Sequence, residues 1–285
     1  MNEAGAASAL HRPAAPRDGG AAPPGPLGPL LRHWREHRRR SQMDLALQVG
    51  VSPRHLSFIE TGKSKPSPAM LLALADGLEV PLRDRNRLLL AAGYAPRYGE
   101  RAWGAADMKP VQAALQRLLD AHQPYPGLVL DRLWNVVHAN AAALALARSI
   151  PAALRTPQLN VFRASLHPQG LAAVTGNFDE WASYLLGTLQ RVVLDSADAE
   201  TEALQREVLQ YPNVQRLLAG PGYRRDAAPA LLVPCVLDLP AGRVSLFTTL
   251  TTFGTPRDIT LDELCVELFY PADAASEAVL RGAAA

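Results

Sequence analysis

The chain has few of the features that mark several large classes of protein. Its 285 residues contain two cysteines, Cys235 and Cys265, far apart and each in an apolar segment. This excludes a disulfide framework or a four-cysteine zinc site, and buried free thiols are the simplest interpretation, with a redox switch as the alternative. No run of about 18 uncharged apolar residues occurs, and no secretory leader is recognisable. We therefore expect a soluble, cytoplasmic protein with no membrane partner.

Common catalytic motifs are also missing. The sequence has no Gly-x-Ser-x-Gly elbow, no Gly-x-x-x-x-Gly-Lys phosphate loop, no Gly-x-Gly-x-x-Gly and no His-Glu-x-x-His. His33 and His37 are spaced to lie on one helix face, but no third metal ligand stands nearby, so solvent-facing histidines are the simpler interpretation. We expect no enzyme and no metal site.

Composition and charge divide the chain. Of residues 1–26, 17 are Ala, Gly or Pro, without apolar periodicity, which predicts a disordered segment. Residues 27–96 hold 11 Lys and Arg against 6 Asp and Glu, whereas residues 97–285 hold 16 against 19. A basic module attached to a mildly acidic remainder is typical of a protein that neutralises phosphate. The alternative is that the arginines only solvate a helix face.

A pair of short helices joined by a sharp turn is predicted within residues 41–63. Ser41 can cap the first helix together with Asp44, Gly50 allows the reversal, and Ser52 followed by Pro53 starts the second helix. The leading end of such a second helix is the part that a DNA major groove receives.

The outward residues of this helix pair are candidates for contact with double-stranded DNA. Arg54, His55 and Ser57 are expected to read base edges, and Gln42 and Lys63 to contact the phosphate backbone. Because one module of this size buries little surface, we expect a homodimer on an operator with two half-sites. The candidate DNA-binding residues are Gln42, Ser52, Pro53, Arg54, His55, Ser57, Lys63 and Lys65.

Further apolar stripes flank the pair: one from Leu27, one opened by Pro68 and one near residues 84–92. Residues 27–96 thereby resemble the Xre/Cro-type helix-turn-helix family, which implies a five-helix, all-α DNA-binding domain. The motifs that carry the resemblance are Gln42, Gly50-Val51-Ser52, Ile59-Glu60-Thr61-Gly62-Lys63 and Pro66-Ser67-Pro68.

The pattern changes after a linker and connector helix at residues 97–123. Residues 126–140 predict a hairpin that turns near Asp131, followed by Asn140 as the cap of a helix at 141–147. Three strand-like runs come later, at 231–239, 244–253 and 264–270. For residues 124–285 we expect an α+β, PAS-like domain, with an antiparallel five-stranded sheet covered by helices on one face.

Residues 97–285 also resemble the MmyB-like ligand-binding domain, which follows an Xre-type domain in bacteria. The resemblance implies a transcriptional regulator whose PAS-like domain holds a small lipophilic molecule, and which molecule it is does not follow from the resemblance. We expect a fatty acid or a similar lipophilic molecule, and no other cofactor. The motifs that carry it are residues 87–96, 124–126, 129–132, Asn140, 166–170, 211–212, 251–256 and 269–273.

A set of aromatic residues and one histidine are the candidate ligand contacts. Such residues are more often core, and a structural hydrogen bond is the simpler role for the histidine, but together they can line an apolar pocket. The alternative is that this domain only dimerises or docks a protein partner. A bound effector is expected to act on DNA affinity through the helix at 109–122. The candidates are Trp134, Phe162, His167, Trp181, Phe247 and Phe253.

Overall fold

The computed structural model describes residues 26–196, 198–220 and 231–284. They form two compact units: one runs to Arg101 and also contains Gly254–Asp262, and the other contains Ala102–Phe253 and the chain from Glu263 onward. We call these the helical unit and the sheet unit. The segment expected to be disordered lies, except for its last residue, outside the described residues.

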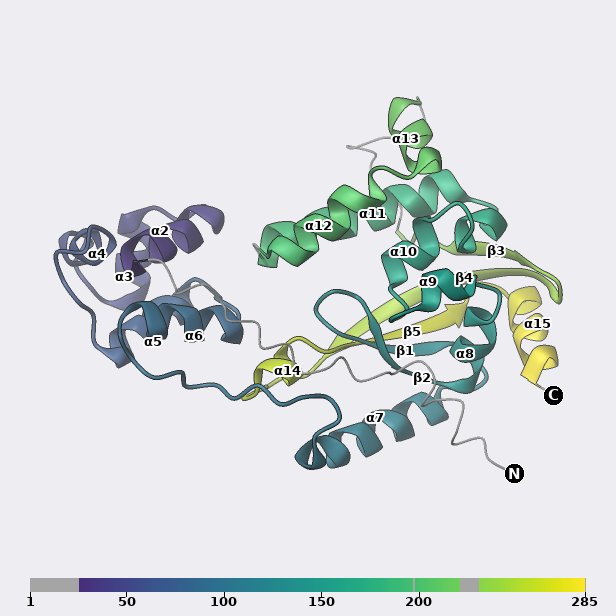
Figure 1. The fold of residues 1–285 in the computed structure, drawn as a ribbon, viewed down its shortest axis with the longest axis horizontal. Coiled ribbons are helices and arrows are strands. Elements are labelled where there is room, and N and C mark those ends of the chain that lie inside the picture. Colours follow the sequence, from purple (N-terminus) through teal and green to yellow (C-terminus); the bar gives the residue numbers. More distant parts are fainter. Residues whose placement is uncertain (1–25, 197, 221–230, 285) are drawn as a thin grey trace. The chain divides into compact units, whose positions relative to one another are not determined.

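The N-terminal part of the helical unit, residues 27–91, contains five helices that follow the predicted apolar stripes (Figure 1). Their inward residues, among them Leu31, Leu45, Leu56, Leu74 and Leu88, form one buried cluster. The predicted five-helix architecture is confirmed. The helices are α2 (Leu27–His37), α3 (Gln42–Val49), α4 (Pro53–Glu60), α5 (Pro68–Gly77) and α6 (Leu82–Ala91).

Local signals set the ends of α3 and α4. The Ser41 side chain accepts a hydrogen bond from the Asp44 backbone N–H at 3.1 Å, and the Asp44 carboxylate accepts one from the Ser41 N–H in return. Gly50 ends α3 with a φ of 76°, a left-handed conformation that favours glycine. Ser52 then caps α4 through the His55 N–H. The predicted capping box, turn and second start are all confirmed.

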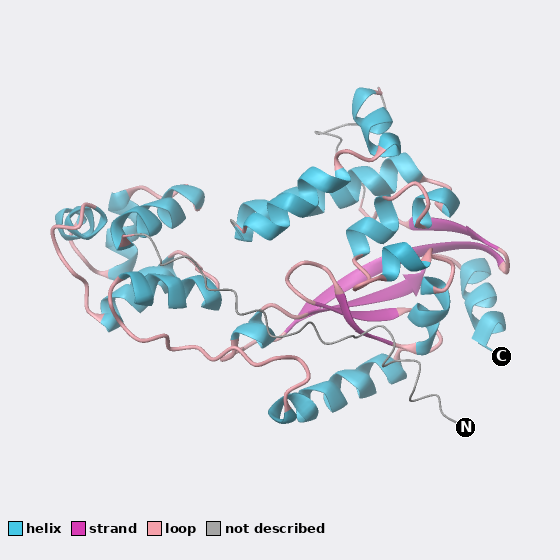
Figure 2. Ribbon diagram, viewed as in Figure 1, coloured by secondary structure: helices cyan, strands magenta, loops and turns pink. Residues whose placement is uncertain are grey.

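The sheet unit combines an antiparallel five-stranded sheet, in the order β2-β1-β5-β4-β3, with helices (Figure 2). The strands are β1 (Gly127–Leu130), β2 (Val136–Ala139), β3 (Cys235–Leu239), β4 (Gly242–Thr252) and β5 (Cys265–Pro271). The α-helices are α7 (Lys109–Ala121), α8 (Ala141–Ala147), α9 (Ala152–Arg155), α10 (Val161–Leu166), α11 (Phe178–Ser196), α12 (Ala199–Val208), α13 (Pro212–Ala219) and α15 (Ala274–Ala284), with short 3-10 turns at Ala106–Met108 and Leu171–Val174.

Helices cover both faces of the sheet rather than one. Residues of α10, α11 and α12 share a buried cluster with Leu237 and Leu246 of the sheet. The opposite face carries Tyr270, whose ring meets that of His122, just after α7, at 4.8 Å. The expectation of a single covered face was therefore wrong. The apolar stripe of α7 is long enough to pack on the sheet, so this helix does more than connect the two domains.

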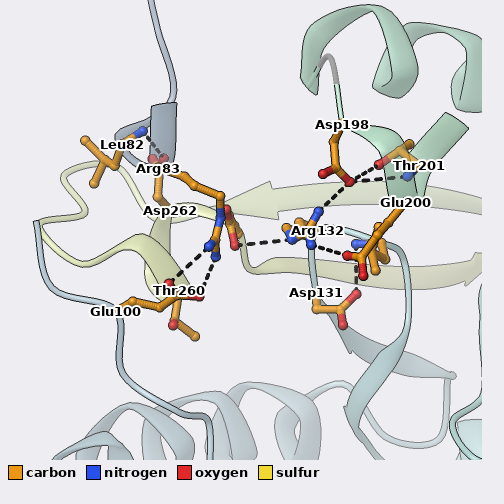
Figure 3. A network of polar contacts seen from close by, with 12 residues as sticks. Leu82, Arg83, Glu100, Asp131, Arg132, Asp198, Glu200, Thr201, Thr260 and Asp262 are labelled. Carbon is orange, nitrogen blue, oxygen red and sulfur yellow. Dashed lines mark hydrogen bonds and ion pairs between the residues drawn. The ribbon is translucent and has the colours of Figure 1, made fainter. Parts of the chain in front are cut away.

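The β1–β2 hairpin and the helix α8 after it agree with the prediction from the sequence. Asn140 caps α8 by accepting a hydrogen bond from the Ala143 N–H at 3.0 Å, as predicted. The hairpin loop is closed by Asp131, whose carboxylate accepts from the Leu133 and Asn135 N–H groups. Burial raises the pKa of Asp131. The neighbouring Arg132 side chain pairs with acidic residues at the start of α12 (Figure 3).

Candidate functional site

A buried ion pair holds the two helices of the helix-turn-helix against α2. Arg35 Nε donates to Glu60 Oε1 at 2.6 Å, and a second guanidinium nitrogen donates to Oε2 at 3.0 Å. Gln42 Nε2 donates to the same Oε2 at 2.8 Å. Burial acts to raise the pKa of Glu60, but the hydrogen bonds from Arg35 and Gln42 hold it below the usual value. This three-residue cluster fixes α4 relative to α2 and α3.

Gln42 therefore has a structural partner that the sequence did not reveal. We had expected this side chain at a phosphate, and the structure commits its amide nitrogen to Glu60. The phosphate contact of Gln42 stays a prediction.

The Phe58 ring of α4 lies beside two cations, Arg54 of the same helix and Lys63 just after it. Arg54 is exposed, and its guanidinium lies 5.3 Å from the centre of the Phe58 ring, while Lys63 Nζ lies 5.9 Å from the same centre. His55 and Ser57 are half-buried beside them. Phe58 itself is half-buried, and its ring supports both cations. Contact with the ring restricts the Arg54 and Lys63 side chains before binding, so they lose less conformational entropy when they contact DNA.

The other residues of this unit that the sequence singled out are Ser52, Pro53, Lys65, His33 and His37. Ser52 and Pro53 form the start of α4, as described above. Lys65 Nζ lies 4.6 Å from the centre of the Tyr94 ring. His33 and His37 stack at 5.9 Å. Across the described residues, no group of three His, Cys, Asp or Glu side chains is placed to hold a metal ion.

A cavity of about 70 Å³ lies inside the sheet unit, between one face of the sheet and the helices on it. Next to it is an open groove of about 790 Å³. The two share four lining residues. The shared residues are Pro126, Leu146, Leu237 and Leu246.

Of the six predicted ligand contacts, the structure brings Trp181 to the lining of the cavity. Trp134 and Phe162 pack on each other at 4.8 Å, with Phe162 fully buried in the core. Phe247 stacks on Tyr270 on the other face of the sheet. Apolar packing with neighbours accounts for these three aromatics without a ligand.

The last two predicted contacts also lie away from this cavity. His167 Nδ1 accepts a hydrogen bond from the Gln169 N–H at 3.1 Å, and its ring meets that of Tyr211 edge-on at 5.0 Å. This is the structural role that we considered the simpler one. Phe253 follows the end of β4 and is half-buried. Neither residue belongs to the lining of the cavity.

Sequence reasoning missed Glu267, which lines the cavity and is 4% exposed. Its Oε2 has no hydrogen-bond partner among the residues that the structure describes. Burial raises the pKa of Glu267 to about 7. The available signal was the presence of one acidic residue inside the apolar run Cys265-Val266-Glu267-Leu268-Phe269.

The two cysteines are free, as expected. Burial raises the pKa of Cys235 to about 12 and that of Cys265 to about 11. At neutral pH both are thiols rather than the more reactive thiolates. In the described parts of the chain, no helix has the length and apolar character needed to cross a bilayer.

The connection between β4 and β5 belongs to the helical unit. Its helix α14 (Ile259–Asp262) packs on α6, and Asp262 accepts a hydrogen bond from the Leu82 N–H at 3.1 Å (Figure 3). Leu82 is the first residue of α6, whose N-cap residue Pro81 offers no side-chain cap. Asp262 therefore satisfies a free N–H of the helical unit from a distant position in the sequence.

Two further contacts fasten the same segment. The Ile259 N–H donates to the Gly99 carbonyl at 2.8 Å. Arg101 donates to the buried Asp258 carboxylate at 2.8 Å. Residues 254–262 thus leave β4, become part of the helical unit and return to β5.

This architecture defines a class of proteins: helix-turn-helix transcriptional regulators with a separate ligand-binding domain. The family described as MmyB-like transcription regulator ligand binding domain matches residues 111–283, and a helix-turn-helix domain matches residues 26–88. The chain belongs to the MmyB-like family of transcription regulators, as its sequence had indicated.

Two curated relatives are similar to part of the chain. They are uncharacterized HTH-type transcriptional regulators of Mycobacterium bovis and Mycobacterium tuberculosis, each 40% identical over 65 residues. The match covers 23% of this chain and 25% of each relative. The chain thus spans about a quarter of the length of the curated relatives that it matches.

Proposed function

We propose that this protein binds a double-stranded DNA operator as a homodimer and that a small lipophilic molecule in the sheet unit regulates this binding. The DNA part of the proposal rests on the Phe58 ring of α4 and on the two cations beside it, Arg54 of α4 and Lys63 just after the helix. The apolar cavity and groove carry the ligand part. On this proposal the protein acts in the cytoplasm, where the DNA lies. It is a regulator and not an enzyme.

The DNA part assigns different roles to the two cations. A bidentate arginine on guanine contributes about 1–3 kcal/mol of discrimination, so Arg54→Ala should relax the sequence preference at one base pair of each half-site. Lys63→Ala should weaken binding to all sequences alike and lower the salt slope by about one, because it removes one phosphate contact. Operator titrations at fixed salt with single-base variants, together with a footprint, measure both effects.

Two results would count against this part of the proposal. One is an unchanged sequence preference in Arg54→Ala. The other is a footprint on one unrepeated half-site together with a monomeric mass. Asp179→Ala, an exposed position on α11, is the matched control and should behave as wild type.

The ligand part needs a route between the two units. The chain offers two covalent routes: the helix at 109–122 expected from the sequence, and the segment 254–262, which joins β4 and β5 and packs on α6. We favour the second route because Asp262 caps α6 directly, so a shift of β5 alters a contact inside the helical unit. The expected coupling is about 1–3 kcal/mol, or roughly 5–150-fold in operator affinity.

Asp262→Ala tests the route. The variant should bind the ligand normally but lose most of the ligand-dependent change in operator affinity. The measurement is operator affinity with and without the tightest binder from a panel of fatty acids, alcohols and amines. If Asp262→Ala kept the full ligand-dependent change in operator affinity, the coupling would instead run through the helix at 109–122. No response in wild type to a ligand shown to bind would leave the sheet unit as a dimerisation or partner-docking domain.

A further inference from the structure

We propose that Glu267 makes the cavity selective for lipophilic molecules whose polar end donates a hydrogen bond, an alcohol or an amine, over ionised carboxylates. The inference rests on the proposed ligand-binding function and specifies its ligand class. It begins from one acidic side chain inside an otherwise apolar lining.

The fold places this carboxyl group at the centre of the sheet. Glu267 lies on β5, the middle strand, between Leu128 of β1 and Leu250 of β4 in the strand register. Thr248 makes a side-chain hydrogen bond to the carboxyl group. Oε2 is left without a partner among the described residues. The carboxyl group thus has one contact from the sheet and one unpartnered oxygen, and Glu267 belongs to the lining of a cavity whose other residues are almost entirely apolar.

A buried polar atom without a hydrogen bond is costly, whereas a ligand that supplies the missing donor recovers that cost on binding. An alcohol donates to either protonation state of the carboxyl group. An amine donates to the carboxylate and pairs with its charge. An ionised carboxylate has no proton to donate, and above a pH of about 7, where Glu267 is itself ionised, the two carboxylates repel each other at short range. The raised pKa of Glu267, about 7, agrees with a site that has no cation of its own.

The rest of such a ligand has a place to lie. The cavity, at about 70 Å³, is less than half the roughly 150 Å³ that accommodates a benzene ring. It therefore takes the polar end and little more. The groove of about 790 Å³ shares Pro126, Leu146, Leu237 and Leu246 with the cavity, so the two lie side by side. An apolar chain in the groove would bring its polar end to Glu267.

The test compares ligands of equal chain length on the full-length protein. The probes are n-decanol, decylamine and decanoate, measured by calorimetric titration at a pH of about 8, where decanoate is ionised. Wild type should bind n-decanol and decylamine at least about tenfold more tightly than decanoate, the effect of one satisfied buried hydrogen bond.

Two variants separate charge from hydrogen bonding. Glu267→Leu should remove the preference and bring the three affinities within about threefold of one another. Glu267→Gln keeps an acceptor, so n-decanol should bind as in wild type while decylamine weakens about tenfold. Asp179→Ala should leave all three affinities unchanged. Thermal unfolding of each variant checks that it is folded.

The outcomes distinguish this inference from the proposed function. Decanoate binding as tightly as n-decanol in wild type would overturn the role of Glu267 while lipophilic binding stands. An unchanged preference in Glu267→Leu would overturn it as well. If neither the three probes nor any fatty acid, alcohol or amine of the wider panel bound the protein, the ligand part of the proposed function would fail. This inference would fail with it.

Discussion

Arg35→Met should destabilise the helical unit by about 3–5 kcal/mol and abolish operator binding. The substitution removes one partner of a buried pair and leaves the Glu60 carboxylate, whose side chain is 1% exposed, with Gln42 as its main donor. An uncompensated buried charge is among the most destabilising changes a single substitution makes. A loss of this size is a large fraction of the stability of a small domain. Urea unfolding followed by circular dichroism measures it.

Two controls separate the buried pair from charge in general. Arg32→Met removes a cation 58% exposed at its side chain, which lies 3.8 Å from Glu60, and should cost little. The double variant Arg35→Met with Glu60→Met should recover much of the loss, because apolar residues can replace a buried ion pair. Equal destabilisation by Arg32→Met and Arg35→Met would contradict this account of the pair.

The sequence predicts the helical unit well because its signals are local. Ser41, Asp44, Gly50 and Ser52 act within three or four residues of their own position, so each cap and turn is legible from the chain alone. The role of Gln42 could not be predicted in this way, because its partner Glu60 is 18 residues away and comes close only when α3 and α4 have packed. The same limit applies to Asp262, whose partner Leu82 is 180 residues distant.

The ligand contacts were harder to predict for a related reason. Five of the six predicted contacts are aromatic, and two of these, Phe162 and Phe247, pack on the rings of Trp134 and Tyr270 instead. Lining a cavity depends on which face of which strand a residue occupies, and a shift of one residue in register reverses that face. Glu267 faces inward because β5 lies in the middle of the sheet, a position set by pairing with β1 and β4 rather than by neighbours in sequence.

The buried carboxyl group should also make stability depend on pH. The pKa of Glu267 is raised from 4.5 to about 7 in the folded protein. Between these values the folded state binds more protons than the unfolded state, so the free energy of unfolding falls as pH rises from about 4.5 and levels off above about 7. The shift corresponds to a loss on the order of 3 kcal/mol. Urea unfolding at several pH values across this range measures it.

Glu267→Gln isolates this contribution. The amide has no proton to lose, so the variant should be less sensitive to pH, and the difference between variant and wild type should grow by about 3 kcal/mol from pH 4.5 to above 7. The other titratable groups that sense Glu267 are Cys235 and Cys265, whose raised pKa values place their own effect above pH 9. The exposed carboxylates are the same in both proteins and cancel in the comparison. If the free energy of unfolding of the two proteins depended on pH in the same way, Glu267 would be hydrated rather than buried. A bound alcohol or amine should weaken the pH dependence of the wild type, because it stabilises the ionised carboxylate.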